Sequence, residues 1–412
     1  MKKSGLLVVL LVVTARPVAA EDLVQVFRDS QRYDATYSAA RNSLVAGRER
    51  LPQGRALLLP TLNLSANATR SRVDVESRDP AVSPSFLRTP DSAGYTLTFT
   101  QPIFRAQNWM QYQQGEFQVR QAEATFGQAS QDLIVRVAQA YFEVGTATIT
   151  DTHEAQARYD LIAAQEIAAL NDLQARRRQL QLISGKEYTE LKQLRGDVKL
   201  SPPNPENVET WAELAEKQSY TVLIQEAGAE VAALEAKRAS AGHLPTLDFV
   251  AQYGQAGETA STTSSVGRDT NSSSVGVQLA LPLFQGGSVS SRERETAALY
   301  QRSKDELDNA RRTALLTARQ LYLSTLNGIT QVAALEQAKV SSQSALDSNK
   351  LGYEVGIRIN IDVLNAQQQL YSTERDLALA RYNTILNNLR LKASAGTLRE
   401  EDLEEINRAL RQ

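Results

Sequence analysis

The chain has 412 residues, no cysteine, 45 basic and 47 acidic side chains, and only 6% aromatic residues. The lack of cysteine excludes a disulfide framework and a lipid anchor on an N-terminal cysteine. The nearly balanced charge provides no electrostatic footprint for nucleic acid. Small and polar residues are plentiful, which favours long helices packed side by side over a compact globule.

The first 20 residues have the pattern of a secretory signal peptide. Two lysines precede an apolar run over 6–13, and a small-residue cleavage site ends at Ala20. We therefore expect residues 1–20 to be removed on export. No later stretch reaches about 18 consecutive apolar residues, so the sequence predicts no transmembrane helix.

Two copies of one pattern follow the leader. LPTLNLSA begins at Leu59 and LPTLDFVA at Leu244, and the proline of a P-[IL]-F motif occurs at Pro102 and at Pro282. The proline-rich SPPNPEN at 201–207 separates the copies as a linker would. The sequence thus predicts a first repeat over 21–200 and a second repeat over 201–412.

Strands with a two-residue period surround these motifs. Apolar and polar residues alternate over about 60–71 and 93–103, and again over about 245–257 and 273–283. Such alternation is typical of a half-buried strand in a soluble sheet. After an export signal, strands of about ten residues also fit the wall of an outer-membrane barrel. Because four strands cannot close a barrel and lipid tolerates no open edge, several chains would have to pool them.

Two pairs of helices account for most of the remaining sequence. In the second repeat, small and apolar residues recur every three or four positions over 287–352, and a return helix is expected over 361–393. Asp362 can cap the start of that return helix. The first repeat predicts a helix over about 106–142 and a return helix over 149–184.

The first descending helix is short. One residue separates Tyr141 from Glu143, whereas 31 residues separate the corresponding Tyr322 from Glu354. The first repeat therefore lacks 30 residues in the helix that leads away from its strands. At 1.5 Å per residue the loss amounts to roughly 45 Å, although the return helix keeps its full length.

The paired LPTL strands, the paired P-[IL]-F turns, two VG turns and the ending NLRLKASAGTLREEDLEEINRAL resemble the TolC family of outer-membrane channel proteins over about 22–410. The resemblance implies a mainly α fold with membrane β-strands. Long antiparallel helical hairpins would form an α-barrel in the periplasm, and each chain of a homotrimer would lend four β-strands to one shared barrel in the bacterial outer membrane.

The resemblance also implies a function and partners. A family member is the passive exit duct of a tripartite efflux or type I secretion system. It docks a periplasmic adaptor (membrane fusion) protein and an inner-membrane transporter of the ABC or RND type. Drug efflux and protein secretion both stay open, because the small residues that line such a tunnel do not indicate which substrate passes through it.

Several residues match the family's periplasmic entrance. Tyr353 and Arg358 match the tyrosine and arginine that tie neighbouring helices together, and Asp151 matches an acidic residue that receives such a link. Asp362 matches one of two acids in a charge constriction, and Asn365 replaces the second. A ring of carboxylates would still attract cations, with one per chain instead of two. The alternative is that Arg358 is an ordinary helix-end residue and Asp362 an N-cap.

The two VG turns, Val144-Gly145 and Val355-Gly356, match the tip segments that meet adaptor hairpins. The alternative is a plain helix-to-helix turn in which glycine adopts a positive φ. This alternative gains weight for the first turn, because the shortened helix need not reach the depth of the second.

No enzyme motif is present. His153 and His243 are far apart in the sequence and have no cysteine or paired carboxylates at metal-ligand spacing, so we interpret them as surface or packing residues. The sequence predicts no catalysis, no metal and no cofactor. Besides the exit duct, two alternatives stay open. One is a truncated, non-conducting relative that acts only in assembly or interaction, and the other is a soluble periplasmic coiled-coil adaptor, which would need no alternating strands.

Overall fold

The computed structural model of the chain describes residues 22–78, 85–145, 156–188, 190–196, 198, 200–260 and 266–410. The predicted signal peptide therefore lies outside the described residues. The chain divides into two compact units. We name Ala40–Gln128 with Glu216–Ala314 the strand unit, and Met1–Ala39 with Ala129–Ala215 and Leu315–Gln412 the helix unit. Each unit contains residues from both predicted repeats, and the division into repeats stays a prediction.

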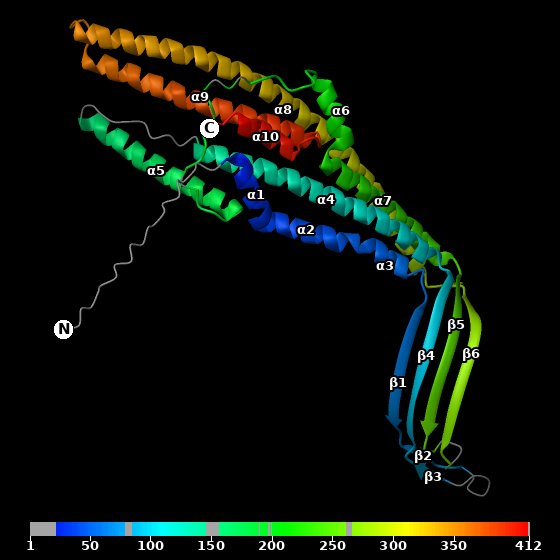
Figure 1. Ribbon diagram of the computed structural model, residues 1–412. Helices are drawn as coiled ribbons and strands as arrows, with labels where there is room; N and C mark the ends of the chain where they lie inside the picture. The colour runs from blue at the N-terminus through cyan, green and yellow to red at the C-terminus, as the bar shows by residue number, and fades with distance from the viewer. Residues whose placement is uncertain are drawn as a thin grey trace, which may run out of the picture. The chain divides into compact units, whose positions relative to one another are not determined.

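The strand unit contains a four-stranded antiparallel sheet with the strand order β1-β4-β5-β6 (Figure 1). Its strands are β1 (Thr61–Arg70), β4 (Asp91–Phe104), β5 (Thr246–Glu258) and β6 (Arg268–Ala280). The short strands β2 (Val73–Val75) and β3 (Phe86–Arg88) pair in a separate hairpin. β6 starts five residues before its expected position at 273 because its pairing with β5 extends through a polar run to Arg268.

Helices continue from this sheet. The strand unit contains α3 (Arg50–Ala56), α7 (Tyr220–Ser240) and a 3-10 turn at Ala241–His243, and most of α2 (Ala35–Arg48) belongs to it. The first parts of α4 (Ala106–Gly145) and α8 (Ser288–Glu354) also lie here. At the junction of sheet and helices, Arg105 and Asp248 form an ion pair with 2.6 Å between Nη2 and Oδ2.

The helix unit contains α1 (Leu23–Tyr33), α5 (Gln156–Ser184), α9 (Asn360–Ser394), α10 (Glu400–Arg408), most of α6 (Val208–Gln218) and the ends of α4 and α8. Its main core joins side chains from α1, α4, α5, α9 and α10, and Phe142, Leu133 and Leu180 are among the most deeply buried. Gly328 lets α8 approach α9 closely, since a Cβ there would overlap the side chain of Thr384.

The two descending helices differ in length. α4 has 40 residues and α8 has 67, which at 1.5 Å per residue correspond to roughly 60 Å and 100 Å. Within the described residues α4 is thus the shorter of the two descending helices, and the bounds given to the two repeats stay a prediction. The return helices α5 and α9 have 29 and 35 residues. The residues expected to begin the first return helix, up to 155, lie outside the described residues.

No helix in the described part of the chain combines the length and apolar character needed to span a membrane.

Candidate functional site

The sheet of the strand unit has two faces of opposite character. Cross-strand partners fall on the same face of an antiparallel sheet, and the register pairs Leu64 with Leu97 and Leu97 with Tyr253. The register in the same way places Asn63 opposite Thr98 on the other face. The apolar face comprises Leu62, Leu64, Tyr95, Leu97, Phe99, Leu247, Phe249, Ala251, Tyr253, Val275, Val277 and Leu279.

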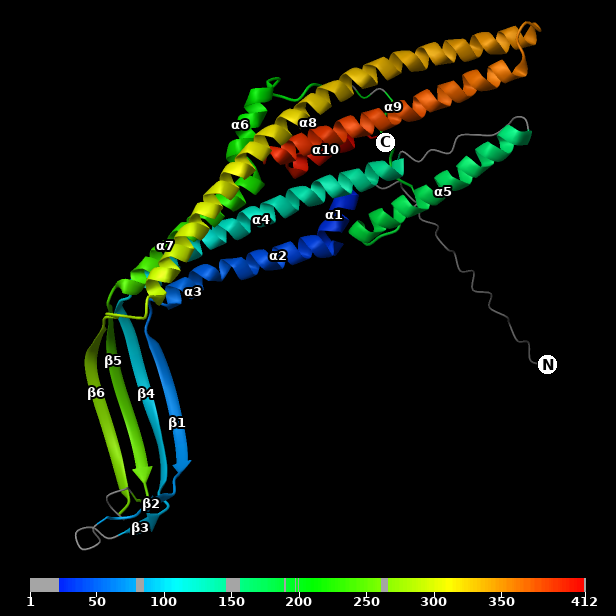
Figure 2. The same cartoon turned by 180° about the vertical axis from the view of Figure 1, so that it is seen from behind.

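None of the helices described in the strand unit covers either face of this sheet (Figures 1 and 2). Leu64 is 69% exposed and Val275 is 72% exposed. A continuous apolar face of this extent is unfavourable in water, but it suits the hydrocarbon layer of a membrane. The main strands have 10 to 14 residues, enough for a tilted strand to cross a bilayer, which takes about 9–11 residues. The open apolar face argues against the half-buried soluble sheet and the soluble adaptor.

The sheet also has two open edges. Every residue of β1 and of β6 is exposed, and each of these strands has only one hydrogen-bonded neighbour in the four-stranded sheet. Within a bilayer, each unsatisfied backbone N–H or C=O group costs several kcal/mol. The sheet therefore requires strands from other chains before it can reside in lipid.

A tight turn joins α8 to α9 in the helix unit. Gly356 has φ 76°, a left-handed conformation that favours glycine. The N–H groups of Ile357 and Arg358 both donate to the carbonyl of Gly352, at 2.8 and 3.0 Å. These bonds satisfy a carbonyl group at the end of α8, as a glycine-based helix end usually does. Gly356 thus has the positive φ that a plain helix-to-helix turn would require.

Apolar side chains project from this turn. Val355 is 61% exposed and Ile357 81% exposed, and Tyr353 and Ile359 on either side are also exposed. Large apolar side chains that gather on a protruding surface commonly mark a contact with a partner. Within the described part of the chain, the α8–α9 turn therefore presents an exposed apolar surface.

Charged and polar side chains lie beside the turn. Arg358, Asp362 and Asn365 line one shallow groove between α8 and α9. Arg358 Nη1 lies 3.7 Å from Asp362 Oδ2, so the arginine contacts a carboxylate of its own hairpin. Tyr353 does not belong to this groove, and Asp151 lies outside the described residues.

Asp362 is not the N-cap of the return helix. α9 begins at Asn360, its N-cap is Ile359, and no side chain caps it. Asp362 is instead the third residue of the helix, where the exposed N–H groups of the first turn favour a negative charge. The sequence prediction was wrong because the turn closes in fewer residues than expected, so the helix starts before the acid.

The first VG turn has different surroundings. Val144 is only 8% exposed, and it belongs to the main core of the helix unit together with Phe142. The Phe142 ring lies 4.9 Å from that of Tyr382, measured between centroids. Gly145 is the last residue of α4. With its side chain inside the core, Val144 has no surface to offer a partner.

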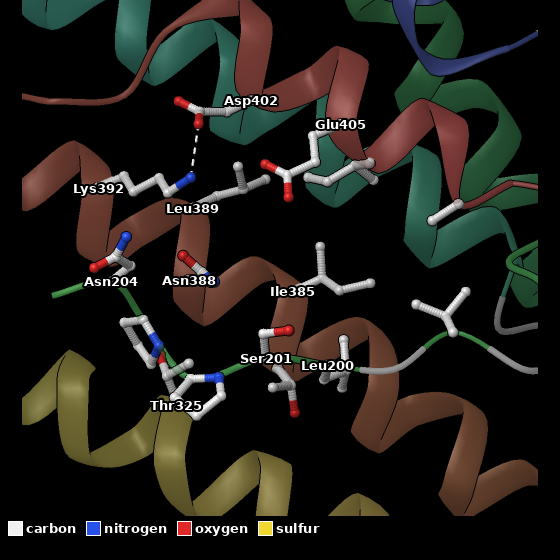
Figure 3. A pocket seen from close by; sticks show the side chains of 16 residues that line it. Leu200, Ser201, Asn204, Thr325, Ile385, Asn388, Leu389, Lys392, Asp402 and Glu405 are labelled. Carbon is white, nitrogen blue, oxygen red and sulfur yellow. Dashed lines mark hydrogen bonds and ion pairs between the residues drawn. The ribbon is translucent and has the colours of Figure 1, made fainter. Parts of the chain in front are cut away.

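A cleft of about 520 Å³ in the helix unit lies among α8, α9, α10 and the segment before α6 (Figure 3). Lys392 and Asp402 form an ion pair across it at 2.7 Å, and the carboxylate of Glu405 points into it. Neither histidine nor cysteine is among its lining residues. The ammonium group of Lys392 is thus engaged by the carboxylate of Asp402.

The sequence also predicts no metal site and assigns both histidines to surface or packing positions. Within the described residues, no group of three or more acidic or histidine residues is placed to hold a metal ion. His243 is half-exposed and lies 3.8 Å from Glu293, as a surface residue would. His153 lies outside the described residues.

A lipid-facing sheet with open edges, continued by long helices, defines a subunit of an oligomeric outer-membrane channel. The model of the outer membrane efflux protein family matches residues 35–147 and 211–397. The chain belongs to this family. It is an outer-membrane channel protein and not an enzyme. Channels of this type are homotrimers that work with efflux or secretion systems.

Individual relatives agree with the family assignment. The chain is 31% identical to the outer membrane protein TolC of Vibrio cholerae, over 96% of this chain and 95% of the relative. It is 30% identical to the protease secretion protein PrtF of Dickeya chrysanthemi, over 98% and 94%. It is also 30% identical to TolC of Escherichia coli, over 95% and 85%.

Solved structures show the same fold. The outer membrane protein VceC of Vibrio cholerae has a TM-score of 0.74 at 18% identity, covering 91% of this chain and 96% of that protein. The outer membrane channel CmeC of Campylobacter jejuni has a TM-score of 0.77 at 14% identity, covering 95% and 90%. The fold class expected from the sequence, mainly helical with membrane strands, is confirmed.

Proposed function

We propose that three copies of this chain form a passive exit duct across the outer membrane for an efflux or type I secretion system. The observation that carries the proposal is the sheet of the strand unit, with one uncovered apolar face and two open edges. Three such sheets, joined edge to edge, would form a closed barrel without unsatisfied backbone groups. The apolar face would contact lipid, and the opposite face, with Asn63, Thr98 and Ser274, would line the aqueous lumen.

Protein secretion and drug efflux are both compatible with such a duct. Relatives at 30% identity include proteins named for protease secretion in Dickeya chrysanthemi and Pseudomonas aeruginosa. A polar lumen suits an unfolded polypeptide as well as small hydrophilic solutes. The energy would come from an inner-membrane transporter of the ABC or RND type.

The α8–α9 turn is the proposed docking point for a periplasmic adaptor. Val355 and Ile357 provide exposed apolar contacts at the end of a long hairpin, and Gly356 fixes the turn that presents them. The buried Val144 cannot contribute in the same way, so we assign one docking tip to each chain. We further propose that Arg358 and Asp362, which already contact each other, form part of the entrance gate.

The second candidate is a non-conducting relative that acts only in assembly. The observation that favours it is the short α4, which has 40 residues against 67 in α8. If α4 is too short in each chain, the helices of the trimer need not form a continuous tunnel. Such a trimer need not conduct ions in a way that the adaptor controls.

Native mass spectrometry of protein extracted gently from outer membranes tests the assembly, and single-channel recording in planar bilayers tests the conduction. A trimer that conducts supports the exit duct. A trimer that never conducts favours the assembly protein. A stable monomer in mild detergent would contradict both proposals, because the open sheet edges would then have no partner.

A further inference from the structure

The two hairpins of the four-stranded sheet have the same register. Leu64 of β1 lies opposite Leu97 of β4, and Phe249 of β5 lies opposite Val277 of β6. The LPTL motifs relate β1 to β5 by a shift of 185 positions, and the P-[IL]-F motifs relate β4 to β6 by a shift of 180. Under these two shifts, all ten residue pairs of the first hairpin coincide with residue pairs of the second. The pairing of one hairpin therefore predicts that of the other.

A third pairing, between β4 and β5, joins the two hairpins, and we name it the internal seam. In it Thr98 lies opposite Gln252, and after an irregularity at Pro102 the pairing continues to Phe104, which lies opposite Leu247. β4 thus remains a strand as far as Phe104 because β5 provides it with partners up to that point.

β6 ends earlier than β4 does. The shift of 180 positions relates Phe104 to Phe284, but β6 ends at Ala280. Within the described residues, the segment 281–284 pairs with no strand, and Leu283 and Phe284 are 88% and 87% exposed. The sequence predicts a strand as far as 283, so this segment has the pattern of a strand but lacks a neighbour. β6 and β1 are the two outer strands of the sheet (Figure 1).

We propose that β6 of one chain pairs with β1 of the next chain in the register of the internal seam. The inference rests on the proposed trimeric duct. The two shifts convert the internal pairs into pairs between chains, which place Gln278 opposite Asn67 and Leu281 opposite Leu64 of the next chain. All hairpins of the barrel then follow one another in a single register, and the ring closes with equivalent contacts.

This register keeps the two faces of the sheet continuous from chain to chain. It brings the apolar Leu281 beside the apolar Leu64, and the polar Gln278 beside the polar Asn67. A shift by one residue would place apolar residues opposite polar ones, because a strand presents alternate residues to opposite faces. The register also gives the segment 281–284 its missing neighbour, so β6 becomes as long as β4.

The internal seam and the seam between chains differ at the end next to the helices. In the internal seam, Nε and Nη2 of Arg105 donate to the carboxylate of Asp248 at 2.8 and 2.6 Å. The two shifts relate Arg105 to Gln285 and Asp248 to Asn63, both of which are exposed in the single chain. Two neutral amides, each able to donate and to accept, therefore meet between chains where an ion pair joins the two hairpins of one chain.

A cysteine scan measures the register in the outer-membrane fraction. The sequence has no cysteine, so Gln278→Cys can be combined in turn with a single cysteine at Asn63, Ser65, Asn67 or Thr69. All four positions face the proposed lumen, and each step moves the second thiol by roughly 7 Å along β1. Within one chain β1 and β6 are three strand spacings apart, roughly 14 Å, which a disulfide cannot bridge. A covalent dimer or trimer on a heated, non-reducing gel therefore reports a link between chains.

We expect the variant with Asn67→Cys to form this link fastest. The positive control is Thr98→Cys with Gln252→Cys, the equivalent pair of the internal seam, whose oxidation is followed by the loss of maleimide labelling. A fastest link at another position would overturn the register and leave the duct intact. The same holds if the internal pair oxidises in a trimer that shows no link between chains. A preparation that contains only monomer by native mass spectrometry would overturn both the register and the duct.

A charge exchange gives a second measurement that does not depend on disulfide formation. Gln285→Arg together with Asn63→Asp copies the ion pair of the internal seam, and charge-assisted hydrogen bonds are roughly twice as strong as neutral ones. The double variant should dissociate in SDS several-fold more slowly than the two single variants predict. Gln285→Arg with Asn67→Asp is the matched control, because Asn67 is four residues, roughly 14 Å, further along β1. Additive effects for both pairs would show that Gln285 and Asn63 do not meet, and would overturn the register.

Discussion

Asp34 is a buried carboxylate that holds the junction of α1 and α2 against α4. Two nitrogens of Arg136 donate to it at 2.9 and 3.2 Å, and the N–H of Tyr37 donates at 2.6 Å. Burial opposes ionisation of Asp34, but these hydrogen bonds outweigh it and hold the pKa of the carboxyl below its ordinary value. Arg136 also pairs with Asp132, whose side chain is 57% exposed.

Asp34→Asn should therefore destabilise the protein at neutral pH by about 1.5–3 kcal/mol, the usual contribution of hydrogen bonds to a charged group. A carboxyl with a depressed folded pKa stabilises above its unfolded pKa, and this contribution is lost as pH falls through the folded pKa. The difference between wild type and variant should thus be full above about pH 4 and shrink below it. Guanidinium denaturation followed by circular dichroism measures it. Asp132→Asn is the control, and it should lower the free energy of unfolding by less than about 1 kcal/mol. If both variants lowered it equally, the burial of Asp34 would not matter and the argument would be refuted.

At the scale of the element, the end of α4 is anchored and not frayed. Phe142 is 1% exposed and stacks against Tyr382, three residues before the helix ends. We predict that Phe142→Ala lowers the free energy of unfolding by about 3–5 kcal/mol, as expected for a phenylalanine removed from a core. Leu182→Ala, at a position that is 77% exposed, should change it by less than about 0.5 kcal/mol. Denaturation midpoints of the two variants measure these changes in the free energy of unfolding. If Phe142→Ala had an effect as small as that of Leu182→Ala, the end of α4 would lie in solvent and not in the core.

The elements differ in how far the sequence predicts them. The strands can be predicted from the sequence because the alternation of apolar and polar residues is a local pattern. The short α4 can be predicted because the two copies of the repeat can be compared residue by residue. β6 extends beyond its alternating part because pairing with β5 continues through Ser272 and Thr270, which no periodicity marks.

The candidate site was harder to predict. The burial of Val144 depends on which helices meet where α4 stops, and a matching motif carries no information about that. The position of Asp362 within α9 depends on how the turn at Gly356 closes. In both cases packing and turn geometry, rather than residue type, decide whether a side chain is available to a partner.

At the scale of the whole molecule, the assignment of lipid and lumen faces can be tested with neighbouring residues of one strand. Val275 and Ser274 are adjacent near the middle of β6 and point to opposite faces, the apolar and the polar one. Val275→Arg should cost about 2–4 kcal/mol of assembly free energy per chain, because it places a charge in hydrocarbon. Three chains multiply this cost, so trimers should largely disappear from the outer-membrane fraction.

Ser274→Arg should leave the amount of trimer unchanged, because its side chain would point into water, and it should alter only the ion selectivity of the channel. Quantitative blotting of unheated samples measures trimer abundance for both variants. The opposite pattern, in which Ser274→Arg abolishes the trimer and Val275→Arg is tolerated, would reverse the two faces. Equal loss for both would mean that this sheet packs against protein on each side, and a barrel wall exposed to lipid would then be excluded.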